Sequence, residues 1–360
     1  MWLRSLIVTL QVVLGLWRSA EGAADANERL IGWGGETYVP AGGGERYPSL
    51  HSADEGWRKG WIQTIAWKPR AVVYHNFLSD QECKHIIQLA GPTMKRSSVV
   101  SADKNNGSHF IDDIRTSFGT FIKRNHDPVV AAIEKRLSLW SHLPVIHQEH
   151  MQVLRYGITN KYGAHTDGLN RTATVLMYLV APDAGGETAF VHSAWSHPQL
   201  RAEAEAEEWS DCARGHVAYK PKRGDALFFF DRLPDGQTAD KHSEHTGCPV
   251  LGGVKWNAVK WIRAVPYRPE EWEESLKKAP APEPDPGLCL DYDKGCQKWA
   301  DGGECTRNVH YMVGGDYHKG HCRRACRTCE PCEEGDMVCF RRNRANAGYL
   351  NYDPAELQGL

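Results

Sequence analysis

Two short segments of this sequence carry the residue types of a metal centre. RYGITNKYGAHTD, at residues 155–167, places His165 and Asp167 two positions apart, and HTGCPVLGGVKW, at 245–256, supplies His245 and Lys255. Because alternate residues of a strand lie on the same face, His165 and Asp167 can point at one ion. Two imidazoles and one carboxylate occupy one face of an octahedral ion and leave three positions open, the arrangement of protein iron(II) sites that activate dioxygen. We expect Lys255 to anchor the far carboxylate of a chelating 2-oxo acid.

Such a centre requires a fold that brings distant segments together. Short runs rich in Val, Tyr, Phe and Trp alternate with Gly, Pro and Asp turns, at 150–156, 172–180, 188–193, 215–221, 225–230 and 255–265. This pattern predicts a sheet sandwich or a jelly roll, and the jelly roll (double-stranded β-helix) is the expected core. Helices are expected to begin at the capping box of Ser79 and Glu82 and at Asp127, which Pro128 follows. The expected fold class is mainly β with flanking helices, plus a small disulfide-rich C-terminal module.

The ends of the chain have a different composition. A short positive segment, an apolar run at 6–17 and small residues at 19–23 predict a secretory signal over residues 1–22, since about 12 apolar residues are too few to span a bilayer. An uncleaved N-terminal anchor is the alternative. The expected divisions are an irregular lead-in (23–60), the main domain (61–268), a Pro-rich linker (269–288), a cysteine-rich module (289–329) and a tail (330–360).

Charge and cysteine usage limit the partners and the compartment. The formal net charge is −2, and without a dominating basic patch we expect no nucleic-acid partner. Eight of the eleven cysteines follow Pro286, which predicts a disulfide framework in an exported protein. We therefore expect the endoplasmic reticulum or Golgi lumen, or secretion, with sequons for N-glycosylation at Asn106 and Asn170.

Several ordered motifs resemble those of the prolyl 4-hydroxylases, particularly the soluble plant and algal type. The resemblance covers about residues 67–262 and is carried by PRAVVYHNFLSDQEC, RTSFGTF, MQVLRYGITNKYGAHTD, RTATVLMYLV, GGETAF, PKRGDALFFF, HTGCPV and KWNAVKWI. It implies that His165, Asp167 and His245 bind Fe(II). It also implies that Lys255 pairs with the C5 carboxylate of 2-oxoglutarate, with L-ascorbate as a further cofactor.

The same resemblance implies roles for residues around the metal. Tyr156 would hydrogen-bond the co-substrate, with Thr174 near the same pocket. The residues expected to line the peptide groove are Tyr162, Arg171, Trp261 and Glu149, and Arg115 falls in a loop that closes over the substrate. Relatives commonly carry a histidine where this chain has Arg263. The resemblance therefore predicts the preferred substrate less directly than it predicts the chemistry.

The cysteine-rich segment resembles the six-cysteine ShK toxin-like module. That resemblance implies the pairs Cys289–Cys329, Cys296–Cys322 and Cys305–Cys326; a zinc site is the alternative, which an oxidising compartment disfavours. Cys332 and Cys339 can pair in the tail, and Cys83, Cys212 and Cys248 form an odd set with at least one thiol left over. Either a binding or tethering role, with an unknown partner, or a passive appendage fits this module.

Taken with these resemblances, the sequence predicts a secretory-pathway prolyl 4-hydroxylase that acts on proline-rich protein segments. The products would be 4-hydroxyproline, succinate and carbon dioxide. Two alternatives stay open. One is an inactive oxygenase-like binding protein, and the other is a 2-oxoglutarate oxygenase that modifies another side chain.

Overall fold

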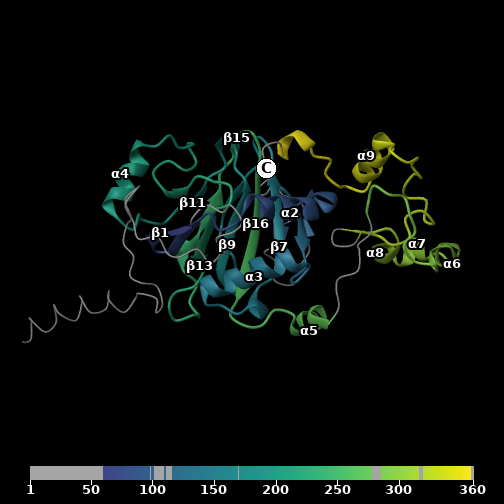
Figure 1. The fold of residues 1–360 in the computed structure, drawn as a ribbon, viewed down its shortest axis with the longest axis horizontal. Coiled ribbons are helices and arrows are strands. Elements are labelled where there is room, and N and C mark those ends of the chain that lie inside the picture. The colour runs from purple at the N-terminus through teal and green to yellow at the C-terminus, as the bar shows by residue number, and fades with distance from the viewer. Residues whose placement is uncertain are drawn as a thin grey trace, which may run out of the picture.

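The computed structural model describes residues 60–97, 99–100, 109–110, 116–168, 170–277, 285–315 and 319–357 (Figure 1). The predicted signal segment, nearly all of the lead-in, Asn106 and Arg115 lie outside the described residues. Within the part of the chain that is described, no helix is both long and apolar enough to cross a membrane.

Two antiparallel sheets form the main domain. The larger has eight strands, in spatial order β1 (Trp61–Trp67), β2 (Arg70–His75), β13 (Ala226–Phe230), β9 (Arg171–Val180), β16 (Lys255–Arg263), β7 (Met151–Tyr156), β6 (Phe118–Ile122) and β3 (Lys95–Arg96). The smaller has four, in the order β12 (Val217–Tyr219), β11 (Thr188–Phe190), β14 (His245–Gly247) and β8 (Tyr162–His165). Short ribbons pair β10 (Ala184–Gly185) with β15 (Val250–Gly252) and β4 (Val99–Val100) with β5 (His109–Phe110).

The chain passes back and forth between the sheets, from β7 to β8 to β9 and from β12 to β13 to β14. This path is that of a jelly roll and confirms the predicted fold class. On β9, Val175 and Met177 face the core beneath the helices, whereas Leu176 and Tyr178 face the space between the sheets. The central strands are therefore apolar on both faces, and the few polar side chains between the sheets stand out as functional candidates.

Helices cover the outer face of the large sheet (Figure 1). α2 (Asp80–Ala90) begins at the predicted capping box of Ser79 and Glu82, and α3 (Pro128–Ser141) begins at Asp127. Glu82 also accepts hydrogen bonds from Arg136 at 2.8 and 2.9 Å, which ties the two helices together. A segment rich in alanine and glutamate forms the mostly exposed helix α4 (Pro198–Ala206).

The predicted linker needs one correction. Its first half is helical, as α5 (Pro269–Lys277), because the segment EEWEESLK contains good helix formers and has no proline after Pro269. Residues 278–284 lie outside the described residues.

The C-terminal module (residues 285–357) is built on disulfides. It contains α6 (Cys296–Asp301), α7 (Glu304–Arg307), α8 (Val309–Met312) and α9 (Met337–Asn346). The structure pairs Cys289–Cys329, Cys296–Cys322, Cys305–Cys326 and Cys332–Cys339. In the main domain it pairs Cys212–Cys248 and leaves Cys83 as a buried thiol.

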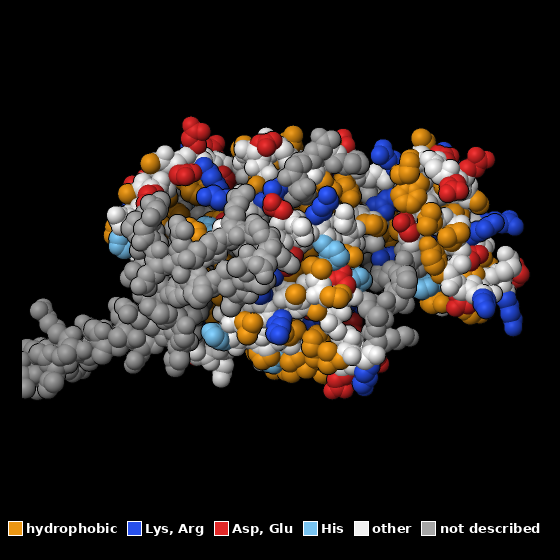
Figure 2. Space-filling model, viewed as in Figure 1, with side chains coloured by type: hydrophobic (Ala, Val, Ile, Leu, Met, Phe, Trp, Pro, Cys, Tyr) orange, Lys and Arg blue, Asp and Glu red, His pale blue; other side chains and the backbone are white. Residues whose placement is uncertain are grey.

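The end of this module packs on the main domain. Arg344 donates to the Gly91 carbonyl at 3.0 Å, and Glu356 accepts from Arg155 Nε at 2.8 Å. Tyr352 lies edge-on to Trp256, with ring centroids 5.3 Å apart. Figure 2 shows hydrophobic side chains gathered along the side of the module that faces the main domain. The tail is therefore part of the main domain's packing, in contrast to a loosely attached appendage.

Candidate metal centre and pocket

Neighbouring strands of the small sheet bring the predicted ligands together. β8 and β14 pair in a register that sets His165 opposite His245, and Asp167 follows β8 by two residues. The Nε2 atoms of the two histidines each lie 3.8 Å from an Asp167 oxygen. Among the described residues this is the one group of three or more His, Cys, Asp or Glu that could hold a metal ion.

Backbone contacts fix which histidine nitrogen faces the ion. His165 Nδ1 lies 2.8 Å from the Gly163 carbonyl, and His245 Nδ1 lies 2.9 Å from the Ser243 carbonyl. A carbonyl can only accept, so each Nδ1 carries the proton and each Nε2 presents its lone pair. Two such imidazoles and a buried carboxylate fit Fe(II) by donor type and number.

The hydroxyl group of Thr174 joins Asp167 to a second carboxyl group, that of Asp231. Thr174 Oγ1 lies 2.7 Å from Asp167 Oδ2 and 2.9 Å from Asp231 Oδ2. Burial, and then the charge of Asp167, raise the pKa of Asp231 well above its ordinary value. Since one hydroxyl has one proton, we assign a protonated Asp231 that donates to Thr174, which donates to Asp167. The chain orients the Asp167 carboxylate.

Electrostatics keep Asp167 itself ionised. Burial pushes its pKa upward, but His245 and His165 in their protonated forms, the charge of Arg171 and the Thr174 hydrogen bond outweigh burial and lower the pKa. With neutral imidazoles, a bound cation would supply the positive charge in place of the two rings. An ionised carboxylate is the form that binds a cation. Sequence reasoning assigned Asp231 to a turn and missed its position; strand alternation from Phe229, which lies against the His245 ring, could have placed it on the pocket face.

Lys255 lines the same pocket as the predicted metal ligands. Its side chain is 4% exposed, and its Nζ donates to the Gly186 carbonyl at 2.7 Å. The other sides of the ammonium group face the rings of Tyr156 and Tyr178, at 5.5 and 5.6 Å. Burial lowers the pKa of Lys255 to about 8, although the charge of Glu187 raises it. No carboxylate of the described residues contacts this buried cation, which therefore suits the far carboxylate of a 2-oxo acid.

The pocket connects the triad with Lys255. The predicted residues that line it are Tyr156, Tyr162, Thr174 and Trp261, together with the triad and Lys255. Thr188 and Asn257, which the sequence did not single out, line it as well. Tyr162 stacks on the His165 ring with centroids 3.7 Å apart. The wall of the pocket is thus aromatic beside the metal ligands.

The outer rim holds three more of the predicted residues. Glu149 accepts two hydrogen bonds from Arg171, at 3.0 and 3.1 Å, and one from Arg263 at 2.8 Å. Arg171 also lies over the Trp261 ring, 3.7 Å from its centroid. The pKa of Glu149 lies below its ordinary value. Burial alone would raise this pKa, but the hydrogen bonds and charges of the two arginines outweigh burial. Asn170 is exposed next to this rim, with φ 60°.

Comparison with known proteins finds prolyl 4-hydroxylases among the relatives of this chain. Residues 151–263 match the model of the 2OG-Fe(II) oxygenase superfamily. "Probable prolyl 4-hydroxylase 4" and "Prolyl 4-hydroxylase 2" of Arabidopsis thaliana are each 41% identical over 278 residues, covering 74% of this chain and 88% of the relative. A solved viral collagen prolyl hydroxylase from Paramecium Bursaria Chlorella virus-1, in a 2OG complex, is 28% identical over 54% of this chain and 96% of that chain, with a TM-score of 0.38.

Proposed function

This chain belongs to the prolyl 4-hydroxylases of the 2OG-Fe(II) oxygenase superfamily, and we propose that it hydroxylates peptidyl proline in proline-rich segments within the secretory pathway. It is a 2-oxoglutarate-dependent dioxygenase. The observation that carries the assignment is the His165–Asp167–His245 triad in one pocket with the buried ammonium group of Lys255.

Fe(II), when bound with 2-oxoglutarate and dioxygen, supplies the oxidation of a proline C–H bond to an alcohol, with release of succinate and carbon dioxide. His165, Asp167 and His245 would hold the ion. Lys255 would pair with the C5 carboxylate of 2-oxoglutarate and, with Tyr156 beside it, fix the co-substrate's orientation. The Thr174–Asp231 pair holds the Asp167 carboxylate in place.

The aromatic wall suits a proline-rich chain. Such chains preform the polyproline II helix and dock on aromatic surfaces at a low entropy cost. Tyr162 and Trp261 provide those surfaces, and Arg171 stacks on Trp261 and bonds to Glu149. We expect these side chains to position the target proline beside the metal ligands.

Incubation with a proline-rich peptide, Fe(II), L-ascorbate and 2-oxoglutarate tests this function. The expected result is a gain of about 16 Da on proline, lost in a His165→Ala variant. His192→Ala is the matched control, because His192 is an exposed histidine that pairs with Glu244 outside the triad. Absence of both hydroxylated product and succinate would instead support an inactive binding protein, and oxygen on another side chain would support the remaining alternative.

The compartment and the further cofactor are also proposals. The five disulfides of the described residues favour an oxidising compartment, either the lumen of the secretory pathway or the exterior. We expect L-ascorbate to sustain turnover and the C-terminal module to take a separate partner. Fractionation of cells that express the whole chain, with turnover assayed with and without ascorbate, tests the compartment and the cofactor.

A further inference from the structure

Two guanidinium groups share one carboxylate at the rim of the pocket. Arg171 binds both oxygens of Glu149, and Arg263 binds one of them through Nε. Glu149 balances a single positive charge, and the charge of Asp167, 3.7 Å from Arg171, would be committed to the metal ion. With the ion bound, the group of three would carry one positive charge in excess. This excess lies beside the aromatic wall that we assign to the peptide.

The excess charge is available on Arg263. Arg171 is engaged on three sides, by Glu149, by the Trp261 ring and by Asp167, whose Oδ1 lies 3.7 Å from Arg171 Nη1. Arg263 uses Nε for Glu149, and one face of its guanidinium lies over the Tyr267 ring, 4.9 Å from the centroid. Its two terminal nitrogens have no hydrogen-bond partner within the described ranges. Its side chain is 27% exposed, which leaves these N–H groups open to a ligand.

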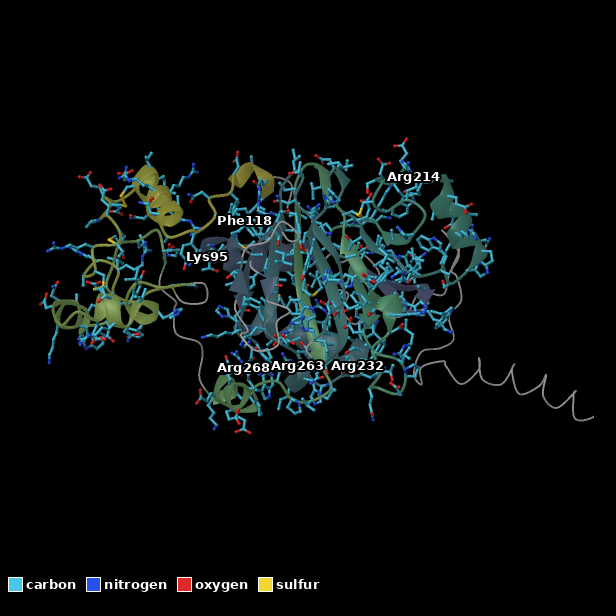
Figure 3. The ribbon with its side chains drawn as sticks, turned by 180° about the vertical axis from the view of Figure 1, so that it is seen from behind. Lys95, Phe118, Arg214, Arg232, Arg263 and Arg268 are labelled. Carbon is cyan, nitrogen blue, oxygen red and sulfur yellow. A yellow bond between two sulfur atoms is a disulfide. The ribbon has the colours of Figure 1, made fainter. Side chains whose placement is uncertain are left out.

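Strand geometry places Arg263 just beyond the aromatic wall of the pocket. Alternate residues of β16, from Lys255 to Trp261, line the pocket. Arg263 comes two residues after Trp261, where the strand ends, and lies at the lower edge of the molecule as drawn in Figure 3. Polyproline II rises about 3.1 Å per residue, so a peptide bound near the triad reaches this arginine within a few residues.

We propose that Arg263 forms a carboxylate subsite, selecting substrates that carry a carboxylate a few residues from the target proline. The proposal rests on the proposed function. An Asp or Glu side chain and a free C-terminal carboxylate offer the same chemistry. Arginine's planar fork suits either group, because its terminal N–H donors match the two oxygens of a carboxylate.

Matched peptides test this subsite. The reference is a neutral proline-rich peptide with an amidated C-terminus; one partner carries Glu two to four residues from the proline, and another has a free C-terminus. We expect kcat/KM to be about fivefold to tenfold higher for at least one carboxylate peptide, as for a partly exposed ion pair. This preference should shrink as salt is added.

Two variants separate charge selection from a structural role. Arg263→Gln should reduce the carboxylate-to-neutral ratio of kcat/KM to about one. Arg268→Gln is the matched control: Arg268 is labelled near Arg263 in Figure 3, pairs with Glu271 and is 60% exposed, and this variant should keep the wild-type ratio.

The ratio decides the proposal whatever happens to absolute activity. If Arg263 only supported Glu149, its replacement would slow all the peptides equally and preserve the ratio, which would overturn the subsite. Equal kcat/KM for all peptides in the wild type would also overturn it, while hydroxylation of the neutral peptide would leave the proposed function standing. Failure to hydroxylate any peptide would overturn both.

Discussion

The pKa of Lys255 predicts how the enzyme's need for 2-oxoglutarate depends on pH. Burial lowers this pKa to about 8, and only the protonated form can pair with the C5 carboxylate. The ammonium group is therefore charged in most molecules at pH 7 and in about one molecule in ten at pH 9. Because one pH unit beyond the pKa reduces the charged fraction about tenfold, the KM for 2-oxoglutarate should rise about tenfold between pH 7 and pH 9.

Substitution at this position separates Lys255 from other titrating groups. Lys255→Met removes a buried, charge-assisted hydrogen bond, and we expect the KM for 2-oxoglutarate to rise about 100-fold. Arginine stays charged over this range, so Lys255→Arg should not show the rise between pH 7 and pH 9.

The assay is succinate formation at saturating peptide, with 2-oxoglutarate varied at each pH. A wild-type KM that is flat from pH 7 to pH 9 would refute the pKa argument. The same rise in Lys255→Met would show that another group titrates, and an unchanged KM in that variant would refute the assignment of Lys255 to the co-substrate.

Three further predictions concern the surroundings of the site. Thr174→Val removes the hydrogen bond to Asp167 and should weaken Fe(II) affinity about 10-fold to 100-fold, measured by metal titration; unchanged affinity would exclude an orienting role. Glu356→Gln leaves Arg155 half-buried without its charged partner and should lower the free energy of unfolding by about 1–3 kcal/mol in a denaturant titration, whereas Glu334→Gln, in an exposed turn, should not. A glycan on Asn170 would stand next to Arg171 and obstruct the rim. Peptide mapping after glycosidase treatment should therefore find this sequon poorly used. Full occupancy in active protein would contradict the predicted obstruction.

Much of the site could be predicted from local sequence because its residues lie on strands or directly next to them. The two-residue spacing of His165 and Asp167 indicates a shared face, and the caps at Ser79 and Asp127 are local features that the structure confirms. The partnership of His165 with His245 depends on the pairing of β8 with β14. No local pattern determines that pairing, and the family resemblance supplied it.

Other features depend on tertiary contacts alone. Asp231 looks like an ordinary turn residue, yet burial and the charge of Asp167 raise its pKa, and its contact with Thr174 makes it part of the site. In sequence the tail likewise appears to be a separate segment. Its contact with the main domain, Tyr352 against Trp256, joins residues far apart in the chain and so leaves no local pattern. The excess charge at Arg263 follows from its one hydrogen bond to Glu149, which joins residues 114 positions apart in the chain.

In the proposed reaction, the triad and Lys255 direct oxidation to C4 of a peptidyl proline. The most direct measurement is the yield of 4-hydroxyproline, by amino-acid analysis, set against succinate formed in the same reaction with a proline-rich peptide. We predict close to one 4-hydroxyproline for each succinate. Succinate that forms without 4-hydroxyproline, at the same rate with or without peptide, would contradict the claim.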